Sequence, residues 1–288
     1  MEIRDLLNDP WLDTLLDQAL AEDIGPGDAS TAITVEPGTR ADARIVAREA
    51  GVLAGLPLLP RLLARLDDGI VVVPESHDGD VVAPGQQVAS LRGAAGPLLT
   101  VERTALNLLQ QLSGIASLTA RYVAAVKGTR CQVLDTRKTL PGWRRLAKYA
   151  VTCGGGNNHR LGLYDRIMLK DNHWAAGDRR IAELVARGRT EYPDLAIEVE
   201  VDTLEQFDAV LALQVEWILL DNFTPEQANA AVRGRDVAGS STLLESSGNV
   251  TLETIRSYAE AGVDAASVGR LTHSAPALDL GVDMELLS

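Results

Sequence analysis

The second half of the chain alternates short apolar runs with amphipathic stretches, and this alternation constrains the fold more than any other feature. The apolar runs are CQVLD, RIMLK, AIEVE, WILLD, TLLES and AASVG, at residues 131–135, 166–170, 196–200, 217–221, 242–246 and 265–269. Amphipathic segments lie between most of them, at 181–191, 204–213, 225–232 and 252–261. Nearly continuous apolar strands separated by helices are typical of a parallel sheet that is covered by helices.

Most of these predicted strands end in a polar residue that can take part in chemistry. The strand-end residues are Asp135, which leads to Arg137 and Lys138, then Lys170, Glu200, Asp221, Glu245 leading to Ser247, and Ser267-Val268-Gly269. In parallel α/β barrels the functional residues lie at the carboxyl ends of the strands, and a barrel gathers those ends into one ring. We therefore predict a barrel of six or seven strands and not an open doubly wound sheet.

The beginning of the chain has a different pattern. Short β-like runs bounded by Gly and Pro lie at 43–49, 69–75 and 79–93, with helices expected at 12–21 and 56–66, which indicates an antiparallel sheet with tight turns. A long helical pattern follows at 99–126, and Ser113-Gly114 predicts an interruption within it. We therefore predict an N-terminal α+β domain at 1–112, a barrel domain at 113–269 and a C-terminal segment at 270–288.

Charge, hydropathy and cysteine content exclude several classes of protein. The formal net charge of -13 disfavours a general binder of nucleic acids or anionic membranes, because their phosphates would repel the chain. The N-terminal MEIRDLLNDPWLDTLL carries acidic residues where a signal peptide carries positive charge, and no apolar run reaches the ~20 residues of a membrane span. Cys131 and Cys153 lack the spacing of a metal site or a disulfide framework. We therefore expect a cytoplasmic protein.

Positive charge is concentrated in one segment of this acidic chain. LDTRKTLPGWRRLAKYAVTCGGGNNHRLGLYDRIMLKDNH, residues 134–173, holds eight of the 27 Lys and Arg residues and only three acidic residues. Arg offers a planar fork for carboxylate or phosphate, Lys a mobile charge, and consecutive glycines let the backbone approach an oxyanion. The segment therefore predicts a local site for a ligand with several anionic groups, lined by Arg137, Lys138, His159, Arg160 and Lys170.

The carboxylates of Glu200 and Asp221 would repel such an anion unless they serve another purpose. They fit a divalent cation, sugar hydroxyls or a cationic transition state. A phosphorylated sugar, best a pyrophosphorylated one with Mg²⁺, combines all these needs. Simpler explanations remain for single residues: Arg144, Arg145 and Lys148 have helical spacing, so at least one is expected to face solvent, and Arg166 and His77 are expected at the surface.

The segment 134–173 resembles the signature region of the quinolinate phosphoribosyltransferase family. Further similarities follow in family order: AEDIGPGDAST, ERTALNLLQQLSGIAS, IEVEVDTLEQ, LLDNF, ESSGN and SVGRLTHSAPALDLG, at 21–31, 102–117, 197–206, 219–223, 245–249 and 267–281. The resemblance covers essentially the whole chain. Two departures are Leu140 before Pro141, where Thr or Ile is more frequent, and Arg270, where a smaller residue is common.

The resemblance implies a reaction and a fold. A phosphoribosyl group passes from 5-phosphoribosyl 1-pyrophosphate (PRPP) to quinolinate with decarboxylation, which gives nicotinate mononucleotide, CO₂ and pyrophosphate in de novo NAD biosynthesis, with Mg²⁺ as cofactor. The implied fold is an N-terminal open-faced α/β sandwich followed by an irregular α/β barrel, with the C-terminal segment returning to the N-terminal domain. The implied assembly is a head-to-tail homodimer with shared active sites, and dimers could assemble into higher oligomers. Nucleic-acid or membrane partners are not expected.

The resemblance also implies roles for individual residues. Arg103 is expected to reach into the site of the partner subunit. Substrate contacts are expected from Thr136, Arg137, Lys138, His159, Arg160, Lys170, Glu200, Asp221, Ser246, Ser247, Gly248, Ser267, Val268, Gly269 and His273. Lys138, Glu200 and Asp221 are expected to be catalytic, and the last two to hold the metal indirectly, through water or ribose hydroxyls.

Three alternatives remain at this point. The chain could be a related barrel phosphoribosyltransferase for another anionic base, such as the molybdenum-transport-associated homologue, but the complete basic set and KDNH favour quinolinate. It could be a non-catalytic anion-binding relative, although Glu200 and Asp221 are both present. Lys138 or Lys170 could form a Schiff base as in class I aldolases, which the neighbouring arginines disfavour.

Overall fold

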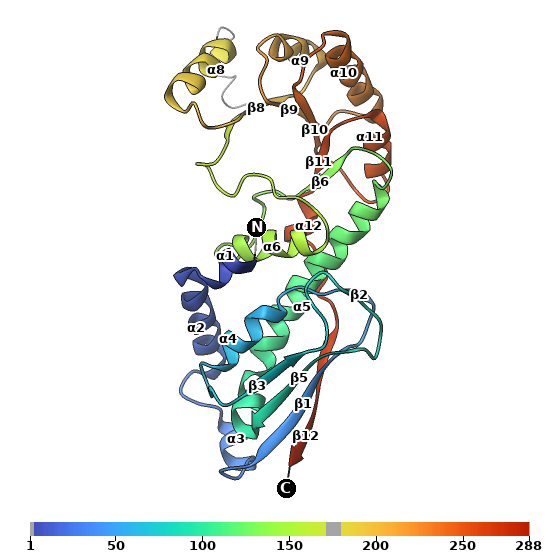
Figure 1. Ribbon diagram of the computed structural model, residues 1–288. Coiled ribbons are helices and arrows are strands. Elements are labelled where there is room, and N and C mark those ends of the chain that lie inside the picture. Colours follow the sequence, from blue (N-terminus) through green and yellow to red (C-terminus); the bar gives the residue numbers. More distant parts are fainter. Residues whose placement is uncertain (1–2, 171–179, 288) are drawn as a thin grey trace. The chain divides into compact units, whose positions relative to one another are not determined.

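The structure is a computed structural model that describes the backbone of residues 3–170 and 180–287 (Figure 1). The motif residues Asp171, Asn172 and His173 lie outside the described residues. The chain forms two compact units: the first comprises Met1–Ala120, Leu140–Gly155 and Ser274–Ser288, and the second comprises Arg121–Thr139 and Gly156–His273. This division differs from the predicted boundaries at 112 and 269 mainly because Leu140–Gly155 groups with the first unit.

The first unit is built on a four-stranded antiparallel sheet in the order β12-β1-β5-β3. The strands are Leu280–Leu287 (β12), Arg40–Ala47 (β1), Gln87–Ala94 (β5) and Val71–Pro74 (β3). Along β1 the buried Ala41, Ala43 and Ile45 alternate with polar residues, so one face of the sheet is apolar. β12 comes from the C-terminal end of the chain and pairs with β1 along its whole length. Gly51–Val52 (β2) and Val81–Val82 (β4) form a separate antiparallel pair.

Helices complete the first unit: Ile3–Leu7 (α1), Pro10–Ile24 (α2), Ala29–Thr34 (α3), Leu56–Leu58 (η1), Leu59–Leu63 (α4), part of Ala95–Ala125 (α5), and Arg144–Cys153 (α6). Asp9 caps α2 by accepting a hydrogen bond from Trp11 N at 2.8 Å, and Pro10 occupies the first helical turn, where its missing N–H costs nothing. α6 contacts α1, and the Tyr149 hydroxyl donates to Asp78 at 2.6 Å. These contacts explain why α6 belongs to this unit.

The long helix α5 is continuous, so the predicted interruption at Ser113-Gly114 is wrong. Ser113 Oγ accepts a hydrogen bond from Ala54 N at 3.0 Å, which keeps its hydroxyl away from the helix backbone. Gly114 lies against Pro276 and Ala277, and a Cβ added there would lie 2.9 Å from Ala277 Cα. This glycine therefore marks a close approach of two backbone segments and not a helix break.

We expect Gly114→Ala to lower the free energy of unfolding by about 1–3 kcal/mol, because the new methyl group forces two packed backbone segments apart. The shift of the urea unfolding midpoint measures the effect. Gly96→Ala in the first turn of α5 is the matched control, since its Cβ would lie 3.5 Å from Thr31 Cγ2, an ordinary contact. A Gly114→Ala protein as stable as the Gly96→Ala protein would contradict the close-approach argument.

The second unit contains a six-stranded parallel sheet in the order β6-β11-β10-β9-β8-β7. The strands are Gln132–Leu134 (β6), Ile167–Leu169 (β7), Ile197–Val201 (β8), Trp217–Asp221 (β9), Leu243–Ser247 (β10) and Ala265–Ser267 (β11). From β7 to β11 and on to β6 the neighbours follow the circular order of a barrel. The seam lies between β6 and β7, which do not pair within the described residues. The predicted parallel α/β architecture is confirmed.

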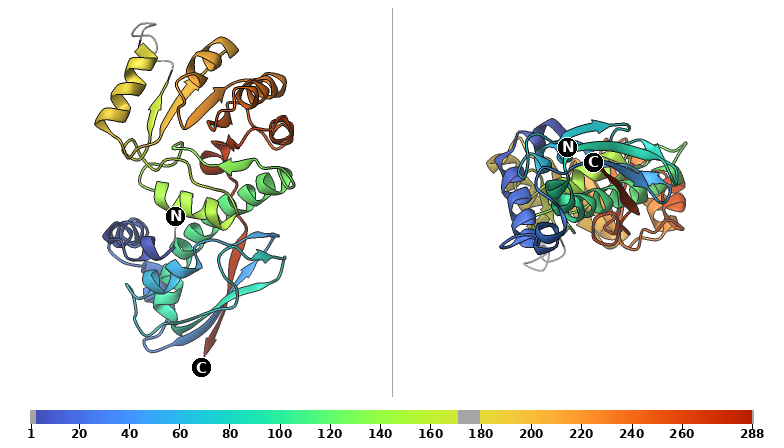
Figure 2. Two further views of the ribbon diagram at one scale, coloured as in Figure 1. Left: turned by 45° about the horizontal axis from the view of Figure 1, so that its top comes forward. Right: turned by 90° about the horizontal axis from the view of Figure 1, so that it is seen from below.

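Helices Arg180–Glu191 (α8), Leu204–Leu211 (α9), Pro225–Val237 (α10) and Ile255–Ala261 (α11) follow the successive strands and lie along the outer side of the sheet (Figure 2). All five residues of β8 are buried, as expected for a strand covered on both faces. Thr224 starts α10 with a capping box to Gln227. A short helix, Arg270–His273 (α12), follows β11. Among the described residues, no helix combines the length and the apolar character that crossing a membrane requires.

Candidate active site

A pocket of about 310 Å³ lies at the carboxyl ends of the strands of the second unit. Ten of the predicted site residues line it: Thr136, Arg137, Lys138, His159, Arg160, Lys170, Glu200, Asp221, Ser247 and Ser267. Three further residues line it: Met168 and Leu219, which the sequence argument missed, and Glu245, which it named at a strand end but not among the substrate contacts. Strand alternation indicates all three, because each lies two residues before a predicted site residue at the end of its strand.

The same alternation explains why some predicted residues do not line the pocket. Ser246 and Val268 are buried at 1 % exposure and absent from the lining, because Ser247 and Ser267 next to them take the inward positions. Gly248 forms a turn with φ +79°. Gly269 makes room for Lys138, since a Cβ there would lie 3.0 Å from Lys138 Cδ.

Two other predicted residues have separate positions. His273 is on α12, and its Nε2 would lie 3.2 Å from a Cβ added at Gly269, so it is close to the Lys138 side chain although it does not line the pocket. Arg103 is exposed on α5 in the first unit, and its expected action in a partner subunit stays a prediction.

Asp135 fixes the backbone of the NNHR segment. Its carboxylate accepts hydrogen bonds from His159 N at 2.9 Å and from Asn158 Nδ2 at 2.7 Å. Asn157 N donates to Val133 O at 2.8 Å, so the segment continues the sheet beside β6. A fully buried aspartate at the end of β6 is therefore a positioning residue for the basic part of the pocket.

The three glycines before this segment do not cradle the pocket, contrary to the prediction. Gly154, Gly155 and Gly156 are absent from the lining. Gly154 ends α6 and packs so closely on α5 that an added Cβ would lie 2.6 Å from Thr119 Cβ. Gly155 adopts φ +81°, which favours glycine. The glycines serve the turn after α6 and its packing.

Arg160 is buried at 9 % exposure and held at both ends. Its backbone N–H donates to His159 Nδ1 at 2.7 Å, and its Nη1 donates to Arg166 O at 3.3 Å. Burial lowers the pKa of Arg160, and the nearby Arg137 guanidinium lowers it further. Two arginines that repel each other in a partly desolvated pocket provide a strong attraction for a dianion.

The acidic side of the pocket is formed by Glu200 and Asp221, which lie near the carboxyl ends of β8 and β9. Lys170 Nζ forms an ion pair with the Glu200 carboxylate. Asn222 Nδ2 donates to Asp221 Oδ2 at 2.8 Å, and Asn249 Nδ2 donates to Asn222 Oδ1 at 3.2 Å. The pocket therefore has cationic and acidic parts that touch through the Lys170–Glu200 pair.

The remaining basic residues of the segment do not line this pocket. Lys148 is fully buried, Arg145 forms an ion pair with Asp9 in the first unit, and Arg144 is half-buried. Arg166 was expected at the surface, but its Nη1 lies 3.2 Å from Glu198 Oε2 and its guanidinium lies over the Trp217 ring. His77 is exposed as predicted.

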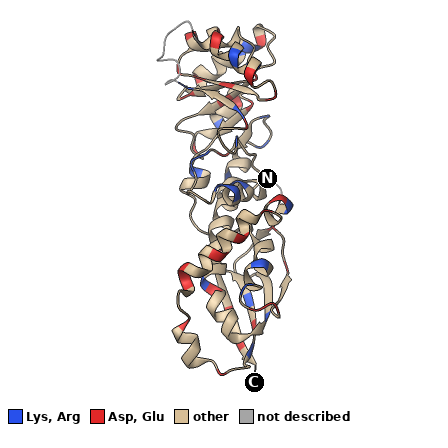
Figure 3. Ribbon diagram, turned by 90° about the vertical axis from the view of Figure 1, so that its left-hand side faces the viewer, with Lys and Arg blue, Asp and Glu red and all other residues tan. Residues whose placement is uncertain are grey.

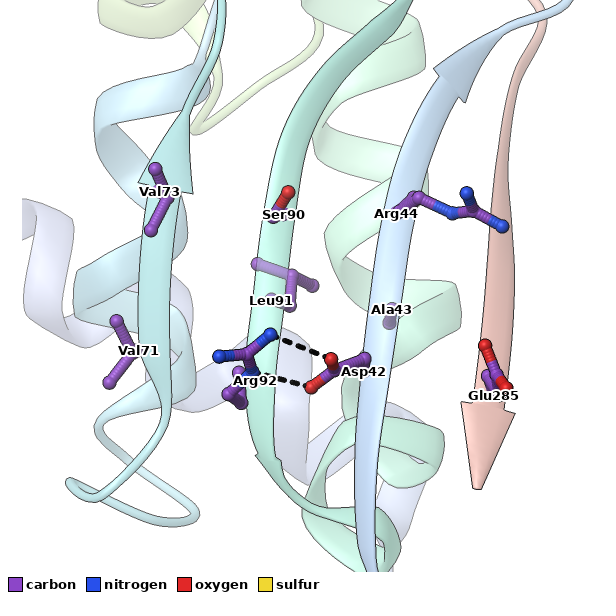
Figure 4. A pocket seen from close by; sticks show the side chains of 9 residues that line it. All are labelled: Asp42, Ala43, Arg44, Val71, Val73, Ser90, Leu91, Arg92 and Glu285. Atoms are coloured by element: carbon purple, nitrogen blue, oxygen red, sulfur yellow. Dashed lines mark hydrogen bonds and ion pairs between the residues drawn. The ribbon is translucent and has the colours of Figure 1, made fainter. Parts of the chain in front are cut away.

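Charge distribution distinguishes this pocket from the hollow on the sheet of the first unit. Acidic residues are spread over both units (Figure 3), yet the pocket has four Lys or Arg residues against three carboxylates. A hollow of about 410 Å³ on the sheet of the first unit is lined by exposed valines and by Arg92, which is already neutralised by Asp42 at 2.6 Å (Figure 4). The pocket of the second unit is therefore the candidate active site.

Comparisons with known proteins point to one family. The family models "Quinolinate phosphoribosyl transferase, N-terminal domain" and "C-terminal domain" match residues 28–113 and 115–283. A carboxylating nicotinate-nucleotide pyrophosphorylase of Mycobacterium leprae is 47% identical over 270 residues, which cover 93% of this chain and 95% of that relative. The crystal structure of NadC from Streptococcus pyogenes is 40% identical, covers 96% of this chain and 97% of that one, and superposes with a TM-score of 0.91.

Proposed function

The chain belongs to the quinolinate phosphoribosyl transferase family, and on this premise we propose that the pocket at the carboxyl ends of β7 to β11 joins quinolinate to PRPP. The family's reaction makes the chain a carboxylating nicotinate-nucleotide pyrophosphorylase, a phosphoribosyltransferase of NAD biosynthesis. The observation that carries the assignment of the pocket is its composition: four Lys and Arg side chains adjoin the carboxylates of Glu200 and Asp221 at the strand ends.

The cationic part of the pocket fits the two adjacent carboxylates of quinolinate. Burying both without compensating charge would be prohibitive, whereas Arg137, Arg160 and Lys170 supply it. The pyridine nitrogen, unprotonated, attacks C1 of the ribose as pyrophosphate leaves. The N-ribosylated ring is then cationic and accepts the electron pair of the C2–carboxylate bond as CO₂ departs. The carbanion left at C2 then takes a proton from water, which gives nicotinate mononucleotide. No side chain has to act as acid or base in these steps, so the residues mainly position the reactants and stabilise charge.

The acidic part of the pocket fits the ribose and the pyrophosphate leaving group. We place Glu200 and Asp221 near the ribose, where their negative charge stabilises the oxocarbenium-like transition state. Mg²⁺, held indirectly by the same two carboxylates, would neutralise charge on the departing pyrophosphate. Glu200 already pairs with Lys170, and Asp221 already accepts a hydrogen bond from Asn222. These partners support indirect contacts between the carboxylates and Mg²⁺, through water or ribose hydroxyls.

The assembly is also part of the proposal. Arg103 lies in the sequence that resembles the family's interdomain helix, and its exposed side chain is available to a second copy of the chain. We therefore propose a head-to-tail homodimer in which Arg103 completes the site of the partner subunit. A cytoplasmic location stays a prediction from the sequence.

We expect the purified protein to convert quinolinate, PRPP and Mg²⁺ into nicotinate mononucleotide with release of CO₂. Nicotinate lacks the second carboxylate and should react at least roughly 100-fold more slowly, because the arginines then remain unpaired in the pocket. Removal of Mg²⁺ with EDTA should abolish turnover, and added Mg²⁺ should restore it. Preference for nicotinate would refute the substrate assignment, and full activity in EDTA would refute the metal.

A further inference from the structure

A buried His159–Glu198–Glu245 cluster lies at the inner side of the pocket. His159 Nε2 lies 3.1 Å from Glu198 Oε2 and 3.4 Å from Glu245 Oε2, and the exposure of these three side chains is 6 %, 0 % and 0 %. The three residues come from the NNHR segment, from β8 and from β10. Their potential ligand atoms all lie within 4.8 Å of one another, close enough for a metal ion.

The hydrogen bonds around His159 define its tautomer. Nδ1 accepts the backbone N–H of Arg160 at 2.7 Å, so Nδ1 carries no proton. The ring proton is therefore on Nε2 and points at the two carboxylates. Burial lowers the pKa of His159, whereas hydrogen bonds to Glu198 and Glu245 would raise it to about 9. An imidazolium, however, would need a second proton on Nδ1, where the Arg160 N–H already points, so we assign the neutral ring.

With a neutral imidazole, the cluster lacks the positive charge to balance two carboxylates. Arg166 Nη1 lies 3.2 Å from Glu198 Oε2 and compensates that carboxylate. Both carboxylate oxygens of Glu245 are buried and lack a well-aligned hydrogen bond within the described residues, and His159 Nε2 approaches Oε2 only to 3.4 Å. Burial raises the pKa of Glu245, and the charge of Glu198 raises it further. Ser267 on β11 also faces Glu245.

We propose that Glu245 is held as the neutral acid and, together with Glu198, clamps the imidazole of His159, which in turn positions Arg160 for quinolinate. The clamp holds Arg160 at both ends: His159 Nδ1 accepts its backbone N–H, and Arg166, paired with Glu198, accepts its Nη1–H through the carbonyl oxygen. His159 thus acts as a positioning residue for Arg160 while it also lines the pocket. This inference deepens the proposed function and rests on it.

The charge states are tested on the enzyme without substrates. At neutral pH, infrared difference spectra of wild type against Glu245→Gln should show one protonated-carboxyl C=O band, and ¹⁵N spectra should show His159 as the neutral Nε2–H tautomer. Glu205→Gln, on the surface of α9, should remove no such band. An imidazolium at His159, no band lost in Glu245→Gln, or a stoichiometric metal ion that this variant loses would each overturn the clamp.

The link to substrate is tested by kinetics. Glu245→Leu should raise KM for quinolinate about 10- to 100-fold, because Arg160 loses its orientation, with a much smaller change in KM for PRPP. Glu245→Gln keeps an amide that is isosteric with the neutral acid and should restore most of the quinolinate affinity. Equal loss for both substrates, or no rescue by Gln, would show a merely structural role. If wild type fails to use quinolinate at all, the proposed function falls, while the spectra still decide the charge states.

Discussion

Glu200→Gln is expected to lower kcat about 10²- to 10³-fold, the range typical of a group that stabilises transition-state charge. The side chain keeps its shape and its position at the end of β8, but it loses the negative charge next to the ribose. Steady-state kinetics with both substrates varied measure the effect, and circular dichroism checks the fold. Glu191→Gln, on the exposed face of α8, removes a carboxylate from the same unit and should leave kcat unchanged.

The ion pair between Lys170 and Glu200 sharpens this test. Loss of the Glu200 charge frees Lys170 from that carboxylate, so the pull of the pocket on a dianion should not weaken. KM for quinolinate is therefore expected to stay level or to fall while kcat falls. A rise in KM for quinolinate with kcat unchanged would instead assign Glu200 a role in binding only.

The fold and the pocket of the second unit are largely predictable from the sequence. The hydrophobic periodicity indicates the strands, and the polar residues at the strand ends indicate the pocket. In a parallel sheet, alternation places Glu200, Asp221, Ser247 and Ser267 on the inner face at the carboxyl ends. The pattern of six such ends was sufficient to identify a single ring of functional residues. The same rule, applied two residues earlier on each strand, identifies Glu198, Leu219 and Glu245.

Long-range packing explains what the sequence did not predict. Gly114 and Gly154 have the local signature of a break or a flexible loop, but each marks a backbone approach to a segment distant in the chain. Arg166 precedes an apolar run, as a surface residue does, yet it is needed inside as the counter-charge of Glu198. The state of His159 depends on Glu198 and Glu245, which lie more than thirty residues away, so no local pattern reveals it.

Complementation between inactive chains should test the proposed sharing of Arg103. Arg103→Ala and Lys138→Ala are each expected to reduce activity at least roughly 100-fold as homodimers, because one lacks a carboxylate ligand and the other a basic residue of the pocket. In a head-to-tail heterodimer, the barrel of the Arg103→Ala chain has its own Lys138 and receives Arg103 of the partner subunit, so one of the two sites is intact. Random mixing makes about half of the dimers heterodimers, and the pool should recover about a quarter of wild-type activity.

A pairing with both defects in the barrel is the control for this experiment. Lys138 and Glu200 line the same pocket in one unit, so a Lys138→Ala chain mixed with a Glu200→Gln chain leaves every site with one defect. No recovery above the residual activities of the two variants is expected there, although subunit exchange is the same. Native mass spectrometry verifies the heterodimers in both mixtures. Recovery confined to the Arg103 mixture requires that Arg103 acts across the interface, because no arrangement within one chain can combine an intact Arg103 with an intact Lys138. Verified heterodimers without recovery would place Arg103 outside the active site of the partner subunit.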